Sequence, residues 1–175
     1  MKITPFSHQL FRVNEEKSKG STLIEITVYT FLLLSFLIIL SEAFFSILDL
    51  GKETESASNI EQDGRFISTR FQYDISNADS ITIPVNTGDQ SSLLQVVIGG
   101  VNHTYAPSGT NLLLTDGSGS DQLNSFYTQI SNLSFTRLGN TGGKNIIKVN
   151  FTLTGTTILS SGPETQNFQI VAGAR

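Results

Sequence analysis

The apolar residues of this chain follow two different patterns along its length. From Leu23 to Leu50 the side chains are overwhelmingly apolar, and residues 26–41 contain neither charge nor proline. With Ala43 to Leu48 added, the run reaches the roughly 20 residues that span about 30 Å of hydrocarbon as a helix. We therefore expect a membrane-spanning helix. The alternative is the core helix of a soluble domain, which is rarely apolar on all its faces in so small a protein.

After this run the pattern becomes amphipathic. Apolar residues recur at spacings of three, four and seven, the repeat of one helix face, at Ile60, Ile67, Phe71, Ile75 and Ala78. Arg70 and Asp74, spaced i, i+4, belong to the expected polar side. We expect one helix from about Thr22 to Asn77, roughly 80 Å long, interrupted in sequence only by Gly51 and Gly64. The apolar stripe is expected to pack on a sheet; the alternative is a binding groove.

From residue 80 onward short apolar and alternating runs predict β-strands. The expected strands are Ser80–Val85, Leu93–Ile98, Val101–Ala106, Asn111–Thr115, Phe126–Leu138, Asn145–Thr154 and Phe168–Ala172. Gly99-Gly100 is typical of a hairpin turn, and an irregularity is expected near Asn132. In the sixth strand, one face is expected to carry Ile147, Val149, Phe151 and Leu153. The connections are too short for parallel crossovers. The fold class is therefore α+β, a long helix packed on a small antiparallel sheet.

Charge is distributed unevenly along the chain. The net charge is −4, of which the segment before Ser21 contributes +2, leaving −6 for the remainder. An acidic body matches nucleic acid poorly, so no nucleic-acid partner is expected. Basic residues precede the apolar run, whereas Lys52 is the only one within a dozen residues after it. The positive-inside rule then predicts a cytoplasmic amino terminus and a body outside.

Glu25 is the unusual residue of the apolar run. A carboxylate costs about 2.5–3.5 kcal/mol at the centre of a bilayer and less near its interface, and such residues are often functional. The alternative is an interfacial carboxylate that the positive end of the helix dipole stabilises. The residue alone does not decide between the two interpretations.

The residues around Glu25 carry a resemblance to a known family. The string K-G-S-T-L-I-E at residues 19–25, followed by the apolar run, resembles the processing signal of type IV pilins and of the pseudopilins of type II secretion. The resemblance implies that a prepilin peptidase cuts between Gly20 and Ser21, that Ser21 becomes N-methylated, and that Glu25 is needed for assembly. The rest of the signal is Lys19, Thr22, Leu23 and Ile24. The family usually has phenylalanine after the cut, where this chain has Ser21.

The same resemblance implies a domain order and a location. Residues 1–20 would be a cytoplasmic leader that is removed, 21–50 the transmembrane and assembly helix, 51–79 its amphipathic continuation, and 80–175 an extracytoplasmic β domain. The expected partners are the peptidase, the membrane, crossed once, and other pilin or pseudopilin subunits bound through the helix. The protein would lie in the cytoplasmic (inner) membrane and then in a pilus or pseudopilus.

Two features are similar to minor subunits of the J/W type. Major subunits generally carry a proline where this chain has Glu42, and often a disulfide, whereas this chain has no cysteine. Residues 65–81 and 130–135 resemble segments of those minor subunits. The expected function is a minor subunit that initiates or caps assembly. The alternative is a filament-tip binding module that contacts a surface, a secreted substrate or DNA.

Little in the sequence indicates catalysis. His8 lies in the expected leader, and a lone His103 in a strand is more often packed or solvated than a base. No serine or threonine has an identifiable catalytic partner, and no phosphate-binding loop opens a helix. We expect no enzyme activity and no cofactor. The Asp116–Asp121 loop offers oxygen ligands for calcium but lacks the spacing of an EF-hand, and such runs are ordinary turns.

Overall fold

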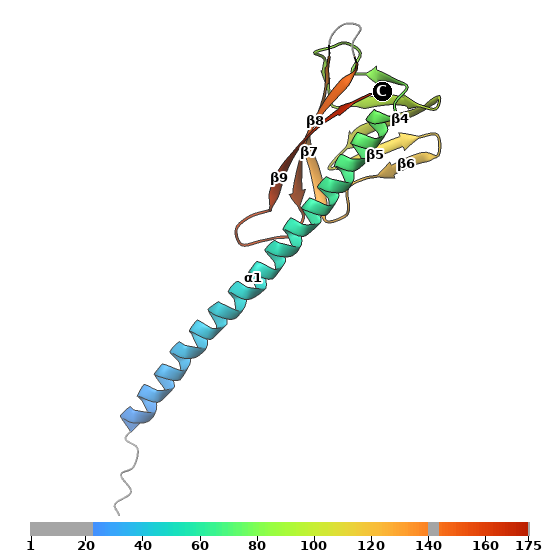
Figure 1. The fold of residues 1–175 in the computed structure, drawn as a ribbon. Helices are drawn as coiled ribbons and strands as arrows, with labels where there is room; N and C mark the ends of the chain where they lie inside the picture. Colours follow the sequence, from blue (N-terminus) through green and yellow to red (C-terminus); the bar gives the residue numbers. More distant parts are fainter. Residues whose placement is uncertain (1–22, 140–143, 175) are drawn as a thin grey trace, which may run out of the picture. The chain divides into compact units, whose positions relative to one another are not determined.

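The structure is a computed structural model that describes residues 23–139 and 144–174. It contains one long helix followed by nine strands (Figure 1), which are α1 (Leu23–Ser76), β1 (Ser80–Ile83), β2 (Gln90–Ser91), β3 (Leu94–Ile98), β4 (Val101–Ser108), β5 (Asn111–Asp116), β6 (Gly119–Gln122), β7 (Thr128–Leu138), β8 (Ile146–Gly155) and β9 (Thr165–Gly173). The chain divides into two compact units, Met1–Phe44 and Phe45–Arg175, so the division falls within α1.

The strands form two antiparallel sheets, one ordered β1-β3-β4-β5-β6 and the other β2-β7-β8-β9. The α+β class and the antiparallel pairing are confirmed, but we expected a single sheet. Two strands were also not predicted. The two-residue β2 was not predicted, and it pairs with β7 through Gln90 and Ser91. The strand β6 begins inside the stretch that was expected to be a loop and ends one residue after it.

The expected Asp116–Asp121 loop is the clearest correction to the predicted elements. Only Gly117 and Ser118 form the turn, and Gly119–Gln122 then pairs with β5 as a strand. The Asp116 carboxylate closes the turn by accepting hydrogen bonds from the Ser118 backbone N–H (2.8 Å) and hydroxyl (2.6 Å). Glycine, serine and aspartate predict a turn by composition, but pairing with a neighbouring strand overrides that weak local preference.

Two backbone features were predicted correctly. Gly99 and Gly100 connect β3 to β4 with φ angles of 57° and 80°, the positive values that a tight hairpin turn requires. The pairing of β7 with β8 shifts between Ser131 and Ser134, and Asn132 between them has φ 52°. Asparagine tolerates this left-handed conformation better than most residues, which makes the bulge compatible with the sequence.

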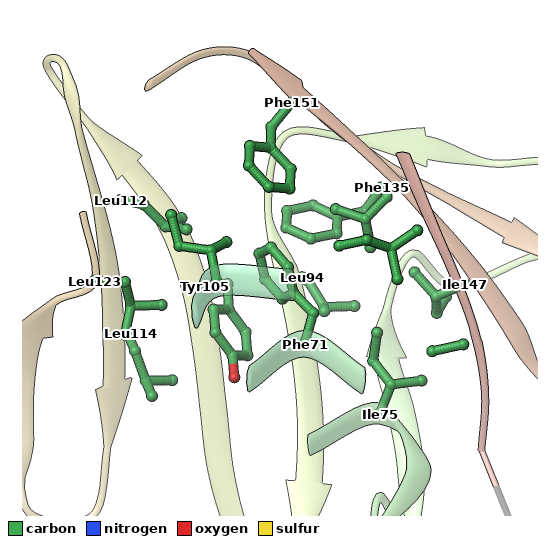
Figure 2. Packing of buried hydrophobic residues seen from close by; sticks show 14 of the residues in the cluster. Phe71, Ile75, Leu94, Tyr105, Leu112, Leu114, Leu123, Phe135, Ile147 and Phe151 are labelled. Carbon is green, nitrogen blue, oxygen red and sulfur yellow. The ribbon is translucent and has the colours of Figure 1, made fainter. Parts of the chain in front are cut away.

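The core lies where the second half of α1 meets both sheets. The expected stripe is confirmed, because Ile60, Ile67, Phe71, Ile75 and Ala78 are all buried. Figure 2 shows Phe71 projecting from the helix into a group of side chains from both sheets. Its ring lies 4.7 Å from that of Tyr105 in the first sheet and 5.4 Å from that of Phe135 in the second. The expected inward face of β8, Ile147, Val149, Phe151 and Leu153, is also buried.

Gly64 allows this close approach of helix and sheet. A Cβ atom built on Gly64 would lie 2.1 Å from Cζ of Phe168 on β9. The Phe168 ring occupies the space above the glycine and stacks on Phe151, with 5.1 Å between ring centroids. A residue that weakens a helix in isolation is therefore required here by packing against β9.

Candidate functional site

The first part of α1 exposes its apolar side chains in the described structure. An 18-residue window of the helix has a mean hydropathy of 2.4, and none of that window is buried. Its large side chains are exposed, among them Phe31 (69%), Ile39 (63%) and Phe45 (64%). The helix is thus long and apolar enough to cross a membrane. An exposed apolar surface of this extent indicates a lipid or protein environment rather than water.

Four hydroxyl groups of this segment form hydrogen bonds within the helix. Thr27, Thr30, Ser35 and Ser41 each donate a hydrogen bond to the carbonyl oxygen four residues earlier, over 2.7–2.9 Å. In hydrocarbon an unpaired hydroxyl has no water to replace its partner and is costly. The four bonds remove this cost, so these polar residues are compatible with a membrane-spanning helix.

Glu25 lies in the first turn of α1 and has one hydrogen-bond partner among the described residues. The Tyr29 hydroxyl, one turn further along, donates to Glu25 Oε1 over 3.1 Å. The carboxylate accepts one bond and has further lone pairs free. We did not single out Tyr29 from the sequence, although its i, i+4 spacing from Glu25 was a readable signal.

The structure describes only some of the remaining residues of the processing signal. Lys19, Gly20, Ser21 and Thr22 lie outside the described residues. Leu23 and Ile24 begin α1 and are 85% and 73% exposed. The structure therefore describes the last three residues of the signal, Leu23 to Glu25, as a regular helix at the start of the apolar segment.

Glu42 is a second carboxylate in the apolar segment. It lies 17 positions after Glu25 on a helix that runs through it without interruption. Its side chain is exposed and has no hydrogen bond or ion pair to any described residue. Glu42 therefore provides a comparison for Glu25, because both residues place one carboxylate on the same apolar helix.

At the other end of α1, Asp74 is the centre of a buried polar cluster. Asp74 accepts hydrogen bonds from the Tyr105 hydroxyl on β4 and from Arg70 Nε, the latter over 3.1 Å. We expected Asp74 on the polar side of the helix, and this was wrong, because its side chain is 2% exposed. The local sequence shows Arg70, four positions earlier, but not the second partner, because Tyr105 lies 31 positions away.

The histidine of this cluster has an incomplete set of partners. His103 Nδ1 lies 3.6 Å from Asp74 Oδ2, is buried, and makes no hydrogen bond to any residue that the structure describes. Burial, followed by the hydrogen bond to Asp74, raises the pKa of Tyr105 well above its ordinary value of 10.0. The cluster joins helix to sheet, and its Arg70 also lines a hollow of about 210 Å³ with Phe66, Thr69 and Tyr73.

The structure gives the calcium candidates no common site. The Asp116 carboxylate is used by the Ser118 turn, whose hydrogen bonds, the hydroxyl first, lower the pKa of Asp116. Asp121 lies on β6 opposite Leu114. Across residues 23–139 and 144–174, no group of three or more His, Asp and Glu side chains is arranged to hold a metal ion.

A second polar cluster, which we did not predict, fixes the connection between β6 and β7. Asp63 on α1 is buried and accepts hydrogen bonds from the Ser125 backbone N–H (2.8 Å), the Ser125 hydroxyl (2.7 Å) and the Thr128 hydroxyl. Between these anchors, Phe126 is 87% exposed and Tyr127 53% exposed. Phe126 was expected to begin a strand, but β7 begins at Thr128.

Comparison of the chain with family models, with curated proteins and with solved structures found no match.

Proposed function

We propose that this chain is a minor subunit of a type IV pilus or a type II secretion pseudopilus, where it helps to initiate or cap the filament. One observation carries the proposal. Glu25 stands in the first turn of an apolar, solvent-facing helix, directly after the residues K-G-S-T-L-I of a prepilin processing signal. The amphipathic second half of the helix, with its β-sheets, supports the same architecture.

The helix would first serve as a membrane anchor. The charge distribution favours a cytoplasmic leader, and the β domain would lie outside the inner membrane. The internal hydrogen bonds of Thr27, Thr30, Ser35 and Ser41 reduce the cost of placing this helix in lipid. The exposed apolar side chains can then exchange lipid for the equally apolar helices of neighbouring subunits.

Processing would supply the positive charge that pairs with the Glu25 carboxylate. Hydrolysis of the bond between Gly20 and Ser21 by a prepilin peptidase releases the α-amine of Ser21, whose ordinary pKa of about 7.7–8.0 leaves it mostly protonated at neutral pH. We propose that this amine pairs with Glu25 of a neighbouring subunit. An unpaired carboxylate in hydrocarbon is costly, so the pairing offsets that cost and fixes the axial register of the two helices.

Tyr29 has a place in this scheme as the partner of Glu25 before assembly. Its hydroxyl donates to Glu25 Oε1 in the single subunit, which compensates part of the cost of the carboxylate near lipid. The second oxygen remains available to a cation. A neighbouring amine can therefore join the pair without first breaking the bond to Tyr29.

The experiment compares two carboxylates of one helix. Glu25→Gln should leave the protein in the membrane and processed, but lower the number of filaments or the amount of secreted substrate about tenfold or more, because the register-setting pair is lost. Glu42→Gln is the matched control and should retain assembly. Normal assembly of the Glu25→Gln variant, or an equal loss in both variants, would contradict the role assigned to Glu25.

A second role, as a binding module at the tip of such a filament, is favoured by one observation. The connection from β6 to β7 presents Phe126 almost fully to solvent although Asp63 binds residues on both sides of it, Ser125 and Thr128. An exposed ring on an ordered loop is typical of a binding surface.

A further inference from the structure

A hollow of about 480 Å³ lies beside the exposed Phe126 ring. It forms where the β4–β5 turn, the end of β6, the start of β7 and the segment after β8 meet. Its wall includes three carboxamides, two free hydroxyls and one aromatic ring, those of Asn111, Gln122, Gln129, Thr110, Thr156 and Phe126. The volume is within the range of about 300–1,000 Å³ that is usual for small-molecule sites.

Backbone hydrogen bonds hold the walls of this hollow together. The Thr110 carbonyl accepts from the Ile130 N–H over 2.8 Å, which joins the β4–β5 turn to β7. The Thr156 N–H donates to the Tyr127 carbonyl over 3.0 Å, which joins the segment after β8 to the loop that carries Phe126. Asp63 also holds the loop that carries Phe126 through Ser125 and Thr128. The hollow is therefore formed before a ligand binds, so binding loses less conformational entropy.

The carboxamides are oriented and retain hydrogen-bonding capacity. Asn111 Nδ2 donates to Gln122 Oε1 over 3.0 Å, and Gln122 Nε2 donates to the Asn124 carbonyl over 2.8 Å. Each amide nitrogen carries a second hydrogen, so both residues can still donate. The side chains of Gln129, Thr110 and Thr156 make no hydrogen bond to any described residue, and all three are exposed.

The lining contains no charged side chain, which excludes most ligand classes. Phosphates, nucleotides and acidic sugars need cationic partners for their anionic groups, and cationic ligands need a carboxylate. A mainly apolar ligand would leave the carboxamides without partners at a cost. What fits is a neutral molecule with many hydroxyls that both donate and accept, and with one apolar face to lie on the exposed ring.

We propose that this hollow binds a neutral carbohydrate, with a pyranose ring stacked on Phe126 and its hydroxyls bonded by Gln129, Asn111 and Gln122. The site names a ligand class for the tip-binding role and does not depend on whether the chain assembles into a filament. A single shallow site of this kind binds weakly, with a dissociation constant on the order of 1 mM.

Ligand-observed saturation-transfer NMR on the full-length chain tests the proposal. The protein is kept in a zwitterionic detergent, because alkyl glycosides would occupy the site with their own sugar head groups. The probes are glucose, galactose, N-acetylglucosamine, N-acetylgalactosamine and their disaccharides, each titrated into the millimolar range. We expect saturation transfer to the ring C–H groups of at least one neutral sugar, and none to glucuronic or sialic acid at equal concentration.

Two variants and one control locate the site. Phe126→Ala should weaken binding about tenfold or more, the effect of losing one well-stacked ring, and Gln129→Ala should weaken it less. Phe66→Ala is the control, because Phe66 is another exposed ring (54%), on α1, that does not line the hollow. Since Phe126 and Gln129 are exposed, all three variants should keep the unfolding midpoint of the wild type.

Three results would overturn the proposal. They are the absence of saturation transfer from every neutral sugar, equal transfer to the acidic sugars, and unchanged binding by the Phe126→Ala variant. A larger particle mass for the wild type than for Phe126→Ala, without sugar binding, would instead assign the ring to contact between subunits and would also overturn it. None of these outcomes changes the Glu25→Gln result, so the two proposals fail separately.

Discussion

The Tyr105 hydroxyl on β4 donates a hydrogen bond to the carboxylate of Asp74 on α1, in a site where both side chains are buried. This contact joins the helix to the first sheet. Arg70 Nε binds the same carboxylate oxygen over 3.1 Å, so a buried negative charge is compensated by one cation and one phenol. A buried carboxylate is stable only with such partners, so each of them should contribute to the stability of the β domain.

Tyr105→Phe should lower the free energy of unfolding by about 1–3 kcal/mol, because it removes one partner of a buried carboxylate and keeps the ring contacts. Urea unfolding of the full-length chain in micelles, followed by near-ultraviolet circular dichroism, measures the change. Tyr73→Phe is the control, since the Tyr73 side chain is 64% exposed and should change stability by less than about 0.5 kcal/mol. Equal stability of both variants would show that the Asp74 contact is dispensable.

The same contact predicts a loss of stability in alkali. Burial and the Asp74 carboxylate raise the pKa of Tyr105 above 10.0, so the folded state keeps the phenol protonated where the unfolded chain ionises it. The stabilisation is complete below pH 10 and is lost as pH rises above it, by up to about 1.4 kcal/mol per pH unit. Unfolding at pH 9, 10 and 11 should show a steeper decline for the wild type than for Tyr105→Phe. Parallel declines would disprove this assignment.

The two described glycines of α1 should respond to alanine in opposite directions. Gly64→Ala places a methyl group against the Phe168 ring and should cost about 1–3 kcal/mol through overpacking. Gly51→Ala meets no atom within 4 Å and should stabilise the helix by about 0.5–1 kcal/mol. Thermal unfolding of both variants measures this. Adding Phe168→Leu to Gly64→Ala should recover part of the loss; no recovery would show that the clash is not with that ring.

Asp63→Ala should release the loop that carries Phe126. The Ser125 N–H donates to Asp63 Oδ2 over 2.8 Å, so its amide hydrogen should exchange about tenfold or more faster in the variant. Hydrogen exchange followed by NMR or mass spectrometry measures the rate. Asp121→Asn is the control, because it removes a carboxylate from the neighbouring β6 and should leave the exchange rate of the Ser125 amide unchanged. If the Ser125 amide hydrogen of Asp63→Ala exchanges as slowly as in the wild type, other contacts hold the loop.

The sequence predicted the parts of the fold that repeat a regular pattern. The stripe of Ile60, Ile67, Phe71 and Ile75 has a period that only a helix buries, and all four side chains are buried as expected. The irregularity at Asn132 was also predicted. In both cases the information is local, because spacing and backbone preference act within a few residues.

The parts that the sequence did not predict depend on partners far along the chain. Asp74 was placed on the polar face because a charge normally lies there, and one of the two partners that stabilise its burial, Tyr105, lies 31 positions later. Asp63 is buried for the same reason, through Ser125 and Thr128 more than 60 positions away. The strand β6 has the composition of a turn, and its pairing with β5 decides its structure.

The amino terminus of the mature protein tests the central claim most directly. The full-length gene product is extracted from membranes of a host that carries a prepilin peptidase, and its intact mass and amino-terminal sequence are measured. Our account predicts a chain that begins at Ser21, with a methyl group on its α-amine, so that Glu25 is the fifth residue. A chain that still begins at Met1 would have no free amine near Glu25, and that result would contradict the proposed assembly mechanism.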